Sequence, residues 1–156
     1  MASTIRGSLA VKRMPRAKDA ERTPALFILH PITREKLAAF GLYRRLEQNP
    51  RVVLRPRYDY FTFIALMHRS RFLVSDGGSN QEEAFYMGKP CLLLRKATER
   101  TEGLDRNVVL SKYDLATIRA FVDNPGRWQF DPGDFGVSPC DVIVDRIRNY
   151  AGAPRP

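Results

Sequence analysis

Cysteine and histidine are scarce in this 156-residue chain, which contains only two of each. The cysteines, Cys91 and Cys140, form neither a metal-binding nor a redox motif. Cys91 lies within an apolar run, so we expect a reduced, buried thiol there. The sequence therefore predicts no metal site and no cofactor.

Long hydrophobic runs are also missing. No apolar run approaches the roughly 20 residues needed to span a bilayer. The basic N-terminus lacks the apolar stretch of about 7–15 residues that a signal peptide contains. With 44% hydrophobic and 28% charged residues, the composition is that of an ordinary globular domain, large enough to bury a core. We therefore expect a cytoplasmic, single-domain protein.

Positive charge is abundant, with a formal net charge of +9 and a pI near 10. A basic nucleic-acid-binding domain is therefore one alternative function. Residues 1–22 carry six basic and two acidic side chains and show no sustained periodicity, so we expect a mobile or weakly attached basic tail. The other basic residues are scattered along the chain, and no basic strand with interleaved aromatics is present. We therefore do not favour nucleic acid as a partner.

Short apolar runs recur at intervals of close to 20 residues from Thr23 onward. They are continuous rather than alternating, which is typical of parallel strands covered on both faces. The expected strands are 25–29, 51–55, 72–75, 91–94 and 107–110, and the expected helices are 33–48, 60–68, 79–87, 114–122 and 140–151. This pattern predicts one doubly wound, Rossmann-like, three-layer α/β domain over residues 23–152, followed by a short tail at 153–156.

The segment after the third expected strand carries the clearest functional signal. In open α/β sheets, ligands bind beyond the carboxyl ends of the strands, which is where Asp76-Gly77-Gly78 lies. The two glycines can adopt positive φ and admit a ligand close to the backbone. Ser79 is suited to N-cap the next helix, with Glu82 completing a capping box. Two interpretations remain open: a tight turn with a capped helix, or a cradle for a phosphate.

Three charged residues bear on the choice between these interpretations. Glu82 is explained by the capping box, whereas Glu83 has no such local role. The two oxygens of Glu83 could accept hydrogen bonds from the vicinal hydroxyls of a ribose. Arg100 could neutralise a phosphate through its fork of donors, or it could be an ordinary solvated surface arginine.

Three blocks of the sequence resemble the C-terminal domain of the UDP-N-acetylglucosamine 2-epimerases. The blocks are HPITREKL (30–37), DGGSNQEEA (76–84) and GKPCLLLRKATER (88–100). The segment RYDYFTF (57–63) matches the family's P-x-x-Y-x-x-F region, and the resemblance covers roughly residues 24–122. It implies a GT-B architecture, in which two Rossmann-like domains hold a UDP-sugar in the cleft between them.

The resemblance implies a UDP-binding role for seven residues. Gly77, Gly78 and Ser79 match the segment that holds the pyrophosphate, and Glu83 matches the residue that binds the ribose. Tyr58 and Phe63 match positions that line the uridine pocket, and Arg100 matches a phosphate contact. Weaker candidates are His30, Gln81 and Glu82. Gly77 and Thr101 depart from the family's serine and proline, and His30 could instead simply end a strand and cap a helix.

The same resemblance implies that part of the catalytic machinery is missing. Members of the family interconvert UDP-GlcNAc and UDP-ManNAc, precursors of cell-surface polysaccharides, by eliminating UDP to give a 2-acetamidoglucal and adding it back. The acid–base carboxylates belong to the N-terminal domain, and a histidine belongs to the first βα unit of the C-terminal domain. This chain enters the pattern only at His30, and His68 lies outside the catalytic motif.

We therefore expect a chain that binds the UDP part of UDP or a UDP-GlcNAc-like sugar but is inactive alone. Its expected partners are a separate chain carrying the N-terminal half or a second copy in a homodimer. The absent first strand and domain should leave an apolar surface exposed. A nucleotide-binding subunit of a split GT-B glycosyltransferase is the other enzyme-related alternative.

Overall fold

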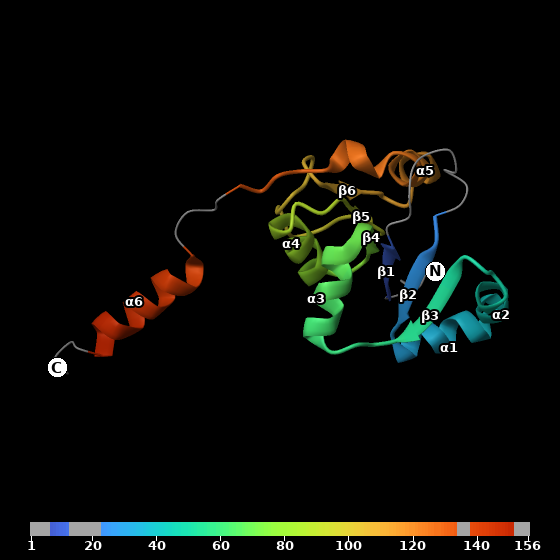
Figure 1. Cartoon of the computed structure of the whole chain (residues 1–156), viewed down its shortest axis with the longest axis horizontal. Helices are drawn as coiled ribbons and strands as arrows, with labels where there is room; N and C mark the ends of the chain where they lie inside the picture. The colour runs from blue at the N-terminus through green and yellow to red at the C-terminus, as the bar shows by residue number, and fades with distance from the viewer. Residues whose placement is uncertain (1–6, 13–22, 134–137, 152–156) are drawn as a thin grey trace.

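The computed structural model describes residues 7–12, 23–133 and 138–151. Its elements are, in chain order, β1 (Gly7–Lys12), β2 (Ala25–Leu29), α1 (Pro31–Ala39), α2 (Leu42–Glu47), β3 (Val52–Pro56), α3 (Tyr60–Arg69), β4 (Ser70–Ser75), α4 (Gly78–Tyr86), β5 (Cys91–Leu93), β6 (Val108–Leu110), α5 (Leu115–Asp123), the short 3₁₀ helix η1 (Pro125–Trp128) and α6 (Pro139–Ala151). Figure 1 shows their arrangement around one sheet.

The sheet has the strand order β3-β2-β1-β4-β5-β6, which is the order of Rossmann-type sheets. The pairs β2–β3, β4–β5 and β5–β6 are parallel, as the continuous apolar runs predicted. The order reverses between β1 and β4, and this switch point is where ligands bind in open α/β sheets. The predicted doubly wound α/β fold is confirmed.

The central strand β1 differs from the Rossmann pattern. It comes from residues 7–12, for which the sequence predicted no regular element, and it runs antiparallel to both β2 and β4. Leu9 pairs with Phe27 on one side and with Val74 on the other. The N-terminal segment thus supplies the strand between β2 and β4. The rest of the expected tail, residues 1–6 and 13–22, lies outside the described residues.

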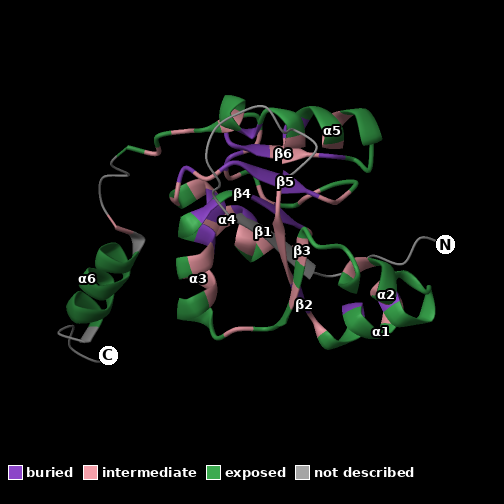
Figure 2. Cartoon of the chain, turned by 45° about the vertical axis from the view of Figure 1, so that its right-hand side comes forward, coloured by how far each residue is buried: buried purple, intermediate pink, exposed green. Residues whose placement is uncertain are grey.

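Helices cover both faces of the β4–β6 half of the sheet. On one face, α3 and α4 pack on a core that includes Met67, Leu73 and Cys91. On the other face, α5 packs against the strands, and the rings of Phe72 and Phe121 meet edge to face with 5.5 Å between centroids. Figure 2 shows the buried residues gathered in this half. The expectation that Cys91 is a buried, free thiol is confirmed, and burial raises its pKa to about 12.

The single helix expected over residues 33–48 is two helices. Gly41 lies between them in the left-handed region, with φ of 68°, and it begins α2. A residue with a Cβ rarely adopts this conformation, so the glycine fixes the break.

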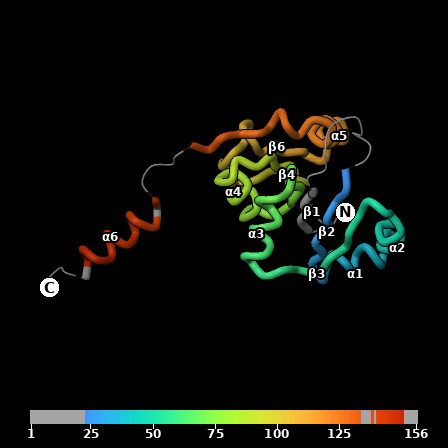
Figure 3. The backbone as a smooth tube through the Cα atoms, in the orientation of Figure 1, coloured from blue at the N-terminus to red at the C-terminus, as the bar shows by residue number. Residues whose placement is uncertain are grey.

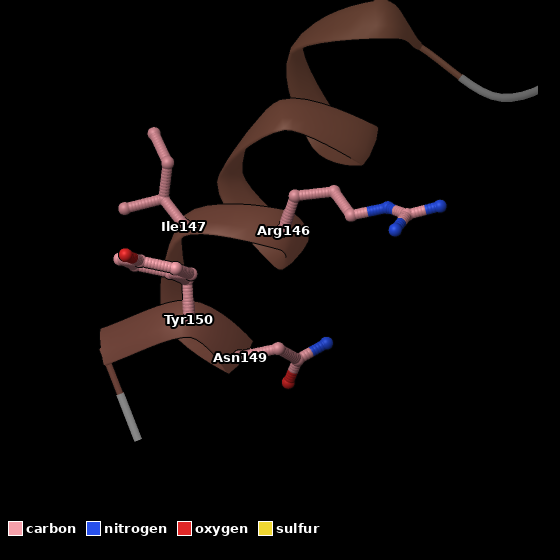
Figure 4. A pocket seen from close by; sticks show the side chains of 4 residues that line it. All are labelled: Arg146, Ile147, Asn149 and Tyr150. Atoms are coloured by element: carbon pink, nitrogen blue, oxygen red, sulfur yellow. The ribbon is translucent and has the colours of Figure 1, made fainter. Parts of the chain in front are cut away.

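Helix α6 lies apart from the sheet at one end of the chain (Figure 1, Figure 3). Several of its apolar side chains are exposed, including Ile143, Ile147 and Tyr150. The hollow drawn in Figure 4 is lined only by residues of this helix, so it is far from the carboxyl ends of the strands. Within the described ranges, no helix is long and apolar enough to cross a bilayer.

Candidate functional site

The candidate site lies where β4 passes into α4. Strand β4 ends at Ser75, and after Asp76 the N-cap of α4 is Gly77, with φ of −90° and ψ of 130°. This turn is at the carboxyl edge of the sheet beside the β1–β4 switch point. The first amides of a helix have no acceptor within the helix, and its dipole attracts anions. The local geometry therefore suits an anionic group.

The predicted capping box is wrong. Helix α4 begins at Gly78, one residue earlier than expected, and its N-cap makes no side-chain hydrogen bond. The Ser75 hydroxyl oxygen sets the turn instead, since it accepts from the Gly77 amide at 3.0 Å and from the Asn80 side chain at 2.8 Å. Ser79 is therefore a helical residue, and Glu82 is available for another partner.

The glycine at position 78 allows the Arg100 side chain to approach its backbone closely, and its own φ angle is not positive. Positive φ occurs at four described glycines, and neither Gly77 nor Gly78 is among them. A Cβ on Gly78 would lie 2.5 Å from Nε of Arg100, whereas the nearest atom to a Cβ on Gly77 would be 3.3 Å away. The Arg100 side chain thus packs directly on the backbone at the start of α4.

Arg100 is held at the start of α4 by a carboxylate. Its Nη1 donates to Oε1 of Glu82 in an ion pair, and both side chains are about two-thirds buried. A second carboxylate, that of Glu99, lies 3.9 Å from Arg100 Nε but is drawn to Arg95 at 3.2 Å. Arg100 is therefore a fixed part of the site and not a solvated surface side chain.

Gln81 ties the loop that carries Arg100 to α4. Its side chain is fully buried, and its oxygen accepts from the Thr98 hydroxyl at 2.9 Å. Its nitrogen donates to the carbonyl oxygens of Arg100 at 3.2 Å and Glu102 at 2.9 Å. The polar atoms of Gln81 are engaged in positioning this loop, which differs from the ligand contact considered from the sequence.

Glu83 presents an oxygen that could accept from a ligand. Its Oε2 is buried and has no hydrogen-bond partner within the described part of the chain. Burial raises the pKa of the Glu83 carboxyl, and a hydrogen bond from the Tyr60 side chain partly opposes that shift. An unpaired, desolvated acceptor is costly unless a donor reaches it, which a ligand hydroxyl could do.

The aromatic residues predicted for the uridine pocket differ in their surroundings. Phe63 packs against the core beside Met67 and Leu73, and Tyr58 is half-buried before the start of α3. Tyr60, which bonds Glu83, was missed by the sequence analysis. The Y-x-x-F spacing of the family fits Tyr60 and Phe63, so that spacing was the signal that could have found it.

His30 ends β2 and precedes α1 as its N-cap, without a side-chain capping bond. Its Nδ1 is buried and has no hydrogen-bond partner among the described residues, and the same holds for the hydroxyl of the fully buried Thr33. His30 thus occupies the N-cap position that the alternative from the sequence gave it, although its side chain makes no capping hydrogen bond. His30 directly follows β2, the strand next to β1, at the carboxyl edge of the sheet.

The fold defines a Rossmann-like α/β domain of the kind found in GT-B proteins. The family model "UDP-N-acetylglucosamine 2-epimerase" matches residues 9–123. The chain belongs to the UDP-N-acetylglucosamine 2-epimerase family.

Individual relatives agree with this assignment. The chain is 32% identical to the UDP-N-acetylglucosamine 2-epimerase of Methanocaldococcus jannaschii over 130 residues, covering 80% of this chain and 35% of the relative. It is 32% identical to that of Yersinia pestis over 144 residues, covering 86% of this chain and 38% of the relative. The chain thus spans little more than a third of the length of these relatives.

Solved structures give the same result. The crystal structure of the M. jannaschii enzyme in complex with UDP-GlcNAc and UDP matches with a TM-score of 0.64 and 25% identity, covering 80% of this chain and 35% of that one. The Neisseria meningitidis enzyme bound to UDP-GlcNAc matches with a TM-score of 0.59 and 27% identity, covering 80% and 36%.

Proposed function

We propose that this chain binds the UDP part of a UDP-N-acetylamino sugar at the start of α4. The observation that carries the proposal is the meeting of three features at the switch point. Among the described residues, these are a helix N-terminus with no side-chain cap, the Arg100 guanidinium packed on Gly78, and a Glu83 oxygen with no hydrogen-bond partner. Relatives whose structures contain UDP or UDP-GlcNAc support the choice of ligand.

Each part of the ligand has a matching group. The pyrophosphate would accept hydrogen bonds from the first amides of α4 and from the Ser79 hydroxyl, and Arg100 would neutralise its charge. The ribose would donate a hydroxyl to Glu83. The aromatic side chains of Tyr58 and Phe63, with Tyr60 beside Glu83, would contact the uridine.

The proposed binding does not include the chemical step. In the family the acid–base carboxylates belong to the other Rossmann-like domain, and this chain spans little more than a third of its relatives. We therefore propose that the 156-residue chain holds the UDP leaving group without epimerising the sugar. Turnover would require the carboxylates of that other domain, in the same protein or in a partner chain.

Calorimetric titration with UDP tests the proposal. The wild-type chain should bind UDP with a dissociation constant below about 1 mM, which is a binding free energy of about −4 kcal/mol or better. Arg100→Ala and Glu83→Ala should each weaken binding by about tenfold or more, since each removes a charge-assisted hydrogen bond. Glu47→Ala, on the exposed surface of α2, is the matched control.

Lack of any UDP binding by the folded wild-type chain would refute the nucleotide site. Conversion of UDP-GlcNAc to UDP-ManNAc by the purified chain would refute the proposed inactivity and leave the binding site intact.

A further inference from the structure

The ion pair between Arg100 and Glu82 has a consequence for the ligand. Arg100 packs against the backbone of Gly78 at the start of α4, where the proposed phosphate would lie. In this structure its Nη1 is already paired with Glu82, and its Nε has no hydrogen-bond partner among the described residues. The cation that should attract the phosphate is thus largely neutralised by a neighbouring carboxylate.

We propose that Glu82 is an internal competitor for the phosphate, which must take its place as the partner of Arg100. This inference rests on the proposed UDP site. An anion arriving at α4 meets Glu82 within contact of the same guanidinium, and two negative groups on one cation repel each other. Glu82 therefore lowers the affinity of the site for any phosphate ligand.

Glu82 is placed to fill this role because it has no other task in the described part of the chain. Helix α4 has no side-chain cap among the described residues, so Glu82 does not belong to a capping box, and its carboxylate pairs with Arg100. It lies one turn into the helix, on the same side as the loop of residues 98–102 that Gln81 fixes against α4. The guanidinium can change partner while that loop stays anchored by Gln81.

Glu99 is a weaker competitor. It is 66% exposed, its distance to Arg100 Nε is 3.9 Å, and its other oxygen is paired with Arg95 at 3.2 Å. Solvent screens an exposed carboxylate, and Arg95 already holds this one. The structure therefore ranks the two acids, with Glu82 first.

Titration of the full chain with UDP at low ionic strength tests this ranking. Glu82→Gln keeps the shape and an acceptor oxygen but removes the charge. It should bind UDP about 3- to 5-fold tighter than the wild type, the size expected for release of an ion pair that is about one-third exposed. Glu99→Gln should give a smaller gain, and Glu47→Gln, which makes the same charge change on α2, should give none. In an Arg100→Ala background the gain from Glu82→Gln should shrink.

The outcomes separate this inference from the function on which it rests. Equal or weaker UDP binding by a folded Glu82→Gln variant, with the wild type binding UDP, would overturn the competition and leave the site. Equal gains for Glu82→Gln and Glu47→Gln would also overturn it, because only net charge would then matter. If neither the wild type nor Glu82→Gln binds UDP, the proposed function itself fails.

Discussion

At the scale of single residues, the candidate site is organised by contacts that spacing in the sequence does not reveal. The block of residues 76–84 located the site, and the predicted reasons for its glycines and acids were only partly right. Gly78 is needed because Arg100, 22 positions later, packs on it, and Glu82 pairs with that arginine. A residue such as Glu82 can pair locally, as in a capping box, or with a residue far along the chain. A single sequence does not show which of the two partners it takes.

Replacing Gly78 by alanine tests the close approach of Arg100. The new Cβ would lie 2.5 Å from Arg100 Nε, so the guanidinium has to move away from the start of α4. We expect UDP binding to weaken by about tenfold, while helix α4 itself tolerates alanine, which favours helices over glycine by roughly 1 kcal/mol. Calorimetry and circular dichroism measure these effects.

Gly126→Ala in η1, away from the site, is the matched control, because the nearest contact of its Cβ would be 3.9 Å. Equal affinities for the wild type and Gly78→Ala would show that Arg100 does not act from this position.

The raised pKa of Glu83 predicts that the stability of the fold depends on pH. Burial raises its pKa above the ordinary value of 4.5, so the unfolded chain loses this proton at a lower pH than the folded chain. The contribution of Glu83 to stability is therefore most favourable below about pH 4.5. It falls as the pH rises through the window between the ordinary and the raised pKa, and it stays reduced above that window.

Glu83→Gln removes this titration. The variant should melt about 1–3 °C above the wild type at pH 7.5, and this advantage should disappear near pH 4. Thermal melts followed by circular dichroism at the two pH values measure the difference. A variant that is less stable at pH 7.5 would mean that the ionised carboxylate is well solvated or paired.

At the scale of secondary-structure elements, the strands and helices after residue 23 follow the sequence pattern closely. Continuous apolar runs predicted β4 and β5 because both faces of these strands are buried. The strand β1 was not predicted, because six residues without a following helix give no periodic signal. This segment is a strand because of its tertiary context: it pairs with the edges of both β2 and β4.

Removal of residues 1–12 tests the role of β1. Without it, β2 and β4 would each present an unpaired edge in the middle of the sheet, and unpaired edges promote association. We expect loss of the cooperative thermal transition, or oligomers by size-exclusion chromatography with light scattering. Removal of residues 1–6 alone, which keeps β1, is the control. A monomer with an unchanged melting temperature after removal of residues 1–12 would show that β1 does not hold the sheet together.

At the scale of the whole molecule, the positive charge is not spread as the sequence analysis assumed. Residues 23–58 carry seven basic and two acidic side chains, whereas residues 59–156 carry thirteen of each. The excess therefore belongs to residues 1–22 and to the part that contains β2, α1, α2 and β3. The segment with α4 and Arg100 is balanced, so attraction of a phosphate there depends on local geometry and not on net charge.

The fold of the domain was thus predictable from the sequence, while its boundaries over residues 23–152 stay a prediction. The family resemblance pointed to the candidate site. The hydrogen-bond and ion-pair partners of its side chains could be found only from the structure. The exposed apolar side chains of α6, such as Ile147 and Tyr150, lie on a helix and not beside the sheet, so the expected apolar surface beside the sheet stays a prediction.

The most direct test of the account is a map of amide chemical shifts in the full, isotopically labelled chain as UDP is added. We predict that the largest changes fall on the amides of Gly78 and Ser79 at the start of α4, with the Arg100 side-chain Nε–H shifting in parallel. Changes confined to α6 or to the basic segment of residues 31–58, with none at the start of α4, would contradict the proposed site.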